Sequence, residues 1–129
     1  MFNLNMKTTI VVDTKIITEY LKTGKGILPA VYEKYSMIIS AASLSELLAS
    51  KTFQDSSLEK EVREFVDKYF IVKDIDKKIA FEAAKLIREY EMNLASAYIA
   101  ATSLVEGHKL LTEDMKTFKD IKGLEFMSV

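Results

Sequence analysis

The feature that most constrains the fold is a short β-branched run, Thr8 to Val12, that ends at an acid, Asp13. The run has no polar face, which is typical of a strand buried on both sides in a parallel sheet. Apolar residues then recur at helical spacing between residues 16 and 21. A buried strand followed at once by an amphipathic helix predicts an α/β protein.

The alternation of strands and helices continues along the chain. The further predicted strands are 37–41, 71–72, 109–112 and 125–129. The further predicted helices begin near Pro29 and Ser43 or span 58–70, 79–90, 95–105 and 115–119. No linker, repeat or low-complexity tract divides the sequence. We therefore predict a single domain, residues 1–129, with a four- or five-stranded, mainly parallel sheet flanked by helices.

Composition limits the classes of function. The 129 residues include no cysteine and one histidine, His108, which argues against thiolate and multi-histidine metal sites and leaves oxygen ligands. The net charge of -1 gives no global attraction to nucleic acid. No stretch approaches the roughly 20 apolar residues of a membrane span, and no secretory signal is visible, so we expect a cytoplasmic location.

Three acids follow predicted strands. Asp13 ends the first strand, Glu46 lies in the helix after the second, and Asp114 follows the strand 109–112. Ligands of open parallel sheets bind beyond the carboxyl ends of the strands. We therefore expect the three carboxylates to face the same end of the sheet.

Each acid alone has an ordinary explanation. Asp13 and Asp114 are suited to cap the helices that they precede, and Ser43 with Glu46 matches a capping box. Together, converging carboxylates raise one another's pKa and call for a neutralising cation. Oxygen ligands favour Mg²⁺ or Mn²⁺, ions that commonly serve phosphoryl-transfer chemistry.

Four short motifs resemble those of the PIN-domain ribonucleases, in particular the VapC-like toxins of toxin-antitoxin systems. They are Val11–Thr14, Ser43–Leu47, Ala97–Thr102 and Leu110–Asp114, the last followed by Phe118. The motifs have the order and spacing of that family, and the resemblance covers nearly the whole chain.

The resemblance implies that Asp13, Glu46 and Asp114 hold Mg²⁺ or Mn²⁺ and activate water for hydrolysis of an RNA phosphodiester. Thr14 and Thr112 resemble the hydroxyl residues that support such a site. The resemblance also implies a homodimer and a short antitoxin protein as partner. Tyr32 and Tyr35 fit either such an interface or the core.

Two positions depart from the family pattern. Ser96 stands where the family normally has an Asp, so one expected metal ligand is missing, and we expect Ser96 to cap the central helix instead. Lys15 stands where relatives commonly have Ser or Asn, and it weakens metal binding if it turns toward the acids. Three explanations stay open: an enzyme that works with three acids, a naturally inactive relative, or a deliberate substitution at position 96.

The leading hypothesis is a Mg²⁺- or Mn²⁺-dependent endoribonuclease of the PIN class, the toxin of a toxin-antitoxin pair, impaired by Ser96. The alternative is a non-catalytic module that binds RNA or an antitoxin. A phosphoacceptor signalling domain also uses acids at strand ends, but it is disfavoured because Asp13 is not followed by a second acid.

Overall fold

The centre of the molecule is a four-stranded parallel sheet, described in a computed structural model that covers residues 7–128. The strands are β1 Thr9–Val12, β2 Ser36–Ser40, β3 Phe70–Lys73 and β4 Lys109–Leu111. They lie in the order β3-β2-β1-β4, and each neighbouring pair is parallel. The predicted α/β class and parallel sheet are confirmed.

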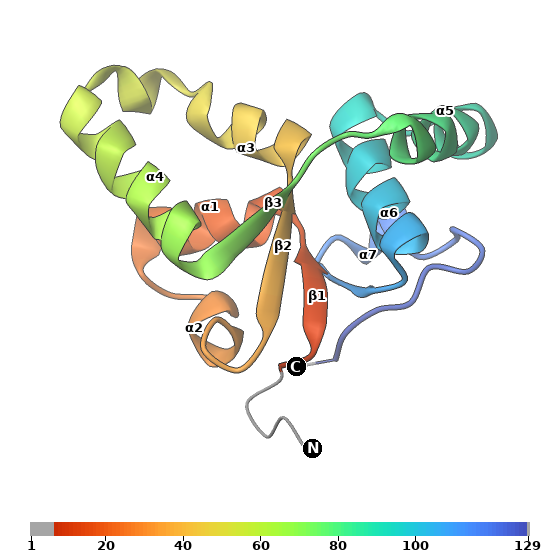
Figure 1. The fold of residues 1–129 in the computed structure, drawn as a ribbon, viewed down its shortest axis with the longest axis horizontal. Helices are drawn as coiled ribbons and strands as arrows, with labels where there is room; N and C mark the ends of the chain where they lie inside the picture. Colours follow the sequence, from red (N-terminus) through yellow and green to blue (C-terminus); the bar gives the residue numbers. More distant parts are fainter. Residues whose placement is uncertain (1–6, 129) are drawn as a thin grey trace.

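Helices cover both sides of this sheet (Figure 1). Their bounds are α1 Thr14–Thr23, α2 Leu28–Val31, α3 Ala41–Leu48, α4 Ser56–Tyr69, α5 Lys77–Tyr90, α6 Leu94–Glu106 and α7 Met115–Phe118, with a 3-10 helix, η1, at Lys51–Gln54. In the view of Figure 1, α1, α2 and α4 lie to the left of the strands, and α5 and α6 lie to the right. None of the helices within residues 7–128 combines the length and the apolar character needed to cross a membrane.

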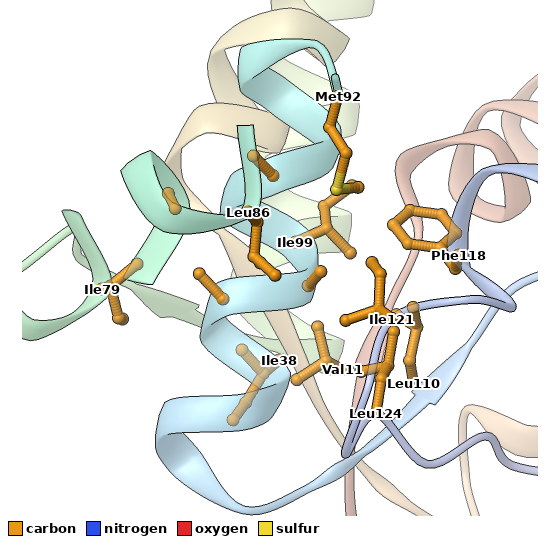
Figure 2. Packing of buried hydrophobic residues seen from close by; sticks show 14 residues of the cluster. Val11, Ile38, Ile79, Leu86, Met92, Ile99, Leu110, Phe118, Ile121 and Leu124 are labelled. Carbon is orange, nitrogen blue, oxygen red and sulfur yellow. The ribbon is translucent and has the colours of Figure 1, made fainter. Parts of the chain in front are cut away.

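The alternation of side chains along the central strands creates two apolar cores. Val11, Ile38 and Leu110 belong to the core beneath α5 and α6, where Figure 2 shows them with Phe118 and Leu124. The intervening strand residues belong to the core beneath α1, α2 and α4: Ile10, Val12, Met37, Ile39 and Leu111. Successive strand residues point to opposite faces, so the run that begins with Thr9 has to be apolar almost throughout.

The second core contains a group of aromatic rings. The Tyr32 ring centroid lies 4.7 Å from that of Tyr69 and 6.2 Å from that of Tyr20. Tyr35 is half-buried and packs against the same core. Of the two roles left open for Tyr32 and Tyr35, the core role is confirmed.

The predicted strand 125–129 is wrong within the described residues. Phe126 forms an isolated bridge with Leu110, and the backbone N–H of Leu110 donates to Glu125 O while that of Met127 donates to Leu110 O. β4 has only three residues, so its outer edge presents a single residue with both groups free to pair. Val129 lies outside the described residues.

Candidate functional site

Asp13 lies at the junction between β1 and α1. Its backbone N–H donates to Leu111 O at 3.0 Å, which extends the pairing of β1 with β4 by one residue. Asp13 occupies the N-cap position of α1, but its side chain makes no capping hydrogen bond. Asp13 is 4% exposed, and its carboxylate accepts a hydrogen bond at Oδ2 from Thr112 Oγ1, at 2.7 Å. The cap explanation is therefore wrong for Asp13.

Thr112 joins two of the predicted acids. Its hydroxyl donates to Asp13 and also accepts from the backbone N–H of Asp114, at 2.9 Å. One hydroxyl thus fixes the Asp13 carboxylate relative to the backbone of Asp114, although 99 residues separate Asp13 from Thr112. This is a physical basis for the supporting role predicted for Thr112.

Asp114 is the N-cap of α7. Its carboxylate accepts from the hydroxyl of Thr117 at 2.7 Å and from the backbone N–H of Thr117 at 3.3 Å. Oδ2 also accepts from Lys15 Nζ at 2.9 Å. These hydrogen bonds, first that of the Thr117 hydroxyl and then that of Lys15, hold the pKa of Asp114 below its ordinary value. The expected rise in pKa is wrong for Asp114 because hydrogen bonds to the charged form favour ionisation.

Lys15 is a cation in direct contact with one of the predicted acids, Asp114. The hydrogen bond and the charge of Asp114 raise the pKa of Lys15, with smaller contributions from the charges of Asp13 and Glu46. The side chain of Lys15 is 75% exposed, but its ammonium group is bound at the acidic edge. Of the two positions that depart from the family pattern, Lys15 does turn toward the acids, and its direct partner is Asp114.

Glu46 stands apart from the other two acids. Helix α3 begins at Ala41, because the Ser40 side chain accepts from the backbone N–H of Ala42 at 3.2 Å. Ser43 is therefore inside the helix, and the predicted capping box is wrong. The carboxylate of Glu46 is exposed and forms no hydrogen bond within residues 7–128. It still lies close enough to Lys15 to contribute to the pKa of that group.

Ser96 lies in the first turn of α6 and does not cap it. The N-cap is Asn93, whose side-chain oxygen accepts from the backbone N–H of Ser96 at 2.8 Å. The predicted capping role of Ser96 is wrong, because Asn93 begins the helix one residue before the predicted start. Within the described residues, the Ser96 hydroxyl forms no hydrogen bond.

The side-chain atoms that could bind a metal ion at this edge are all oxygens, and these are the ligands that hard cations such as Mg²⁺ prefer. Asp13 Oδ1 accepts no hydrogen bond from residues 7–128, and the buried hydroxyl of Thr14 has no partner there. As arranged, the described residues include no group of three His, Cys, Asp or Glu side chains close enough to share a metal ion. Lys15 and Thr117 instead occupy the oxygens of Asp114, so metal binding by the three acids stays a prediction.

A groove with a volume of about 770 Å³ begins beside these residues. Thr14, Lys15 and Glu46 line it together with apolar side chains of α1, η1 and α4, among them Leu21, Phe53 and Phe65. Sequence patterns did not reveal this groove, since its walls come from helices whose relative placement is set by the sheet. The contact of Thr117 with Asp114 was also missed, although a Thr three residues after an N-cap Asp is a recognisable signal.

Comparisons with known proteins agree on one family. The family profile described as PIN domain matches residues 10–124. No curated protein sequence is similar enough to this chain to be matched with it.

Several solved structures share the fold. VapBC from Salmonella typhimurium, in a DNA-bound crystal, has a TM-score of 0.81 at 20% identity, covering 95% of this chain and 98% of that one. VapBC2 from Rickettsia felis, bound to a promoter DNA fragment, has a TM-score of 0.77 at 20% identity, with 93% and 98% covered. A toxin-antitoxin complex from Klebsiella pneumoniae has a TM-score of 0.74 at 25% identity, with 89% and 94% covered. The chain therefore belongs to the PIN domain family and resembles its VapC-like toxins.

Proposed function

We propose that this chain is a divalent-metal-dependent endoribonuclease, the toxin of a toxin-antitoxin pair, acting in the cytoplasm with an activity reduced by Ser96. The observation that carries the proposal is the Thr112 hydroxyl, which joins Asp13 and Asp114 at the carboxyl edge of the sheet. Burying a carboxylate costs free energy unless an opposite charge or hydrogen bonds compensate for it, and Asp13 does not gain the hydrogen bonds of a helix cap. A cation bound beside a phosphodiester substrate would compensate for the buried charge.

Asp13, Glu46 and Asp114 are the residues that would hold Mg²⁺ or Mn²⁺. When bound, the ion would supply positive charge beside the scissile phosphate. Asp13 is held in place by Thr112, and its Oδ1 accepts no hydrogen bond within residues 7–128. Glu46 is exposed and lies beside the groove, so its carboxylate can orient the water that attacks the phosphorus atom and accept its proton. The leaving ribose oxygen then takes up a proton from solvent.

Ser96 reduces the capacity of this site. A neutral hydroxyl is a poorer ligand for Mg²⁺ than a carboxylate, and the cluster carries three negative charges where the family pattern has four. Position 96 is in the first turn of α6, where an acid also interacts favourably with the helix dipole. We therefore expect Ser96→Asp to fold and to strengthen metal binding.

The test is an RNA cleavage assay with Mg²⁺ or Mn²⁺ that compares the unchanged chain, Ser96→Asp and Ser96→Asn. The two variants have side chains of the same size, but only the first adds a charge. We expect Ser96→Asp to cleave at least about tenfold faster than the other two proteins, and Asp13→Asn to abolish this gain. Absence of cleavage by folded Ser96→Asp would contradict the catalytic proposal.

We also propose that the groove between α1 and α4 receives the antitoxin. Its walls are mainly apolar, and its charged lining residues are Glu19, Glu46 and Glu61 together with Lys15 and Lys22. A mainly apolar segment that places a basic residue beside one of these acids would fit. The Klebsiella structure is itself a toxin-antitoxin complex. Co-expression with a candidate antitoxin should give a complex that Phe65→Asp disrupts while circular dichroism verifies that this variant is folded, whereas Phe81→Asp, outside the groove, should leave the complex intact.

A second candidate function is a non-catalytic module that binds RNA or an antitoxin. The specific observation in its favour is the Lys15 ammonium, which occupies Asp114 in the way that a bound cation would. This function predicts RNA binding that is unchanged by a chelator and by Asp13→Asn. Binding that requires Mn²⁺ would exclude it.

A further inference from the structure

The ammonium group of Lys15 is held at the acidic edge by a specific contact. Lys15 lies in the first turn of α1, and its Nζ is 2.9 Å from Asp114 Oδ2. Asp114 is 22% exposed, so the contact is formed at a partly enclosed carboxylate. If Lys15 pointed only into solvent, Thr117 would be the one described residue that donates hydrogen bonds to this carboxylate.

The contact leaves Asp114 little capacity for another cation. Its Oδ2 accepts from both Lys15 and the Thr117 hydroxyl, and its Oδ1 accepts from the backbone N–H of Thr117. A carboxylate oxygen has about two lone-pair sites, so Oδ2 is saturated. Oδ1 keeps one site, so a metal ion that binds through Oδ2, or through both oxygens, has to displace one of the two donors on Oδ2.

Lys15 is the donor that can leave. The Thr117 hydroxyl belongs to the capping turn of α7, whereas three-quarters of the Lys15 side chain is exposed and its flexible stem can move into water. A divalent ion placed at Asp114 would also repel the ammonium group at this distance. Binding of the ion and release of Lys15 are therefore coupled.

We propose that Lys15 is an internal counter-cation that competes with a divalent metal ion for Asp114, so that binding of the metal is coupled to the release of Lys15. The inference rests on the metal site of the proposed function. The three acids carry three negative charges and Lys15 offsets one of them. The apparent affinity for metal is then the intrinsic affinity reduced by the fraction of molecules in which Lys15 is released.

The test measures binding of Mn²⁺ to the full chain without RNA, by electron paramagnetic resonance and calorimetry. Lys15→Met removes the ammonium, and Lys15→Arg retains a cation. Lys116→Met is the matched control, because it removes one positive charge two residues after Asp114 from a side chain that forms no ion pair within residues 7–128. Circular dichroism verifies that each variant is folded.

We expect Lys15→Met to lower the dissociation constant for Mn²⁺ by about tenfold, a typical size for the coupling of two binding events. Lys15→Arg should bind no more tightly than the unchanged chain, and Lys116→Met should change the constant by less than about threefold, as a screened surface charge does. Equal affinities of Lys15→Met and the unchanged chain would overturn the inference. Equal gains in Lys15→Met and Lys116→Met would also overturn it.

The outcomes separate this inference from the proposed function. If all proteins bind Mn²⁺ equally and Ser96→Asp cleaves RNA, the counter-cation role is wrong while the nuclease stands. If none of the proteins binds Mn²⁺, including Lys15→Met and Ser96→Asp, both are wrong.

Discussion

Asp13 and Asp114 have the same formal position, one residue before a helix, but their carboxylates do different things. Asp114 caps α7 through Thr117, which is the ordinary role of an Asp at this position. Asp13 leaves the first turn of α1 uncapped and directs its carboxylate to Thr112. The identity of a residue before a helix therefore does not tell whether it caps. The competing partner of Asp13, Thr112, directly follows a strand, β4, that is distant in the sequence.

At the residue scale, Thr112→Val should destabilise the protein. The change removes the donor to Asp13 and the acceptor of the Asp114 N–H while keeping the shape of the side chain. Loss of one partner of a buried polar group costs about 1–3 kcal/mol. Urea unfolding should show a loss of this size for Thr112→Val and a clearly smaller one for Thr112→Ser, which keeps the hydroxyl. Equal losses in both variants would mean that the hydrogen bonds do not stabilise the fold.

At the scale of helices, the sequence predicted the existence of elements better than their first residues. Gly24 and Gly107 end α1 and α6 in the left-handed conformation that glycine adopts readily. The starts of α3 and α6 were placed too late, because Ser40 and Asn93 cap these helices ahead of Ser43 and of the predicted start at 95. Several residues near each start are able to cap, and packing against the sheet decides which one does.

Asn93 and Ser96 allow the caps to be tested directly. Asn93→Ala removes the side-chain oxygen that accepts from the backbone N–H of Ser96, so we expect a loss of about 1 kcal/mol in the free energy of unfolding. Ser96→Ala should change it by less than about 0.5 kcal/mol, as most substitutions without a lost contact do. Chemical denaturation of the two variants measures both values. A larger loss for Ser96→Ala would restore the cap first expected at that position.

The N-cap of α4 should make stability depend on pH. Hydrogen bonds from the Ser57 hydroxyl and backbone N–H hold the pKa of Asp55 below its ordinary value of 3.8. A carboxyl group whose pKa is lower in the folded state stabilises the fold above its unfolded pKa, and this contribution is lost as pH falls through the folded value. Thermal unfolding should thus show Asp55→Asn to be less stable than the unchanged chain at neutral pH. The difference should shrink below about pH 3.8. A difference that stays constant down to the lowest pH would rule out a contribution from the charge.

On the scale of the whole molecule, the sheet was predictable and the electrostatics of its edge were not. Each strand coincides with a short apolar run in the sequence, and the alternation of strands with helices predicts the parallel arrangement. Thr112 links the Asp13 carboxylate to the backbone N–H of Asp114, whereas the convergence of the three carboxylates on one metal ion stays a prediction. Lys15 was identified as unusual, but its partner was not, because a flexible side chain can reach several acids and only the assembled fold selects one. The groove depends on helix placement, which no local pattern encodes.

The edge of the sheet predicts self-association, in keeping with the homodimer expected from the family resemblance. β3 is an edge strand, and exposed apolar side chains occur on it and on the segment that follows: Ile71, Val72, Ile75 and Phe81. Phe81 is 66% exposed, and exposed apolar patches mark interfaces. We expect light scattering to report a dimer for the unchanged chain and a monomer for Phe81→Lys. Met115→Lys, which changes an exposed apolar residue on α7, should remain dimeric. A monomer at all concentrations in the unchanged chain would contradict this surface.

The pairing of β1 with β4 sets an order of events during translation. Val12 is in register with Leu111, and the hydrogen bond between Thr112 and Asp13 spans 99 residues. At roughly 5–20 residues per second, a ribosome would need about 5–20 seconds to progress from one to the other. Throughout this interval the nascent chain carries Asp13 without Thr112 or Asp114. A nuclease built in this way would gain its acidic site only after Thr112 and Asp114 have been synthesised, which leaves time for a partner already present in the cell to meet it.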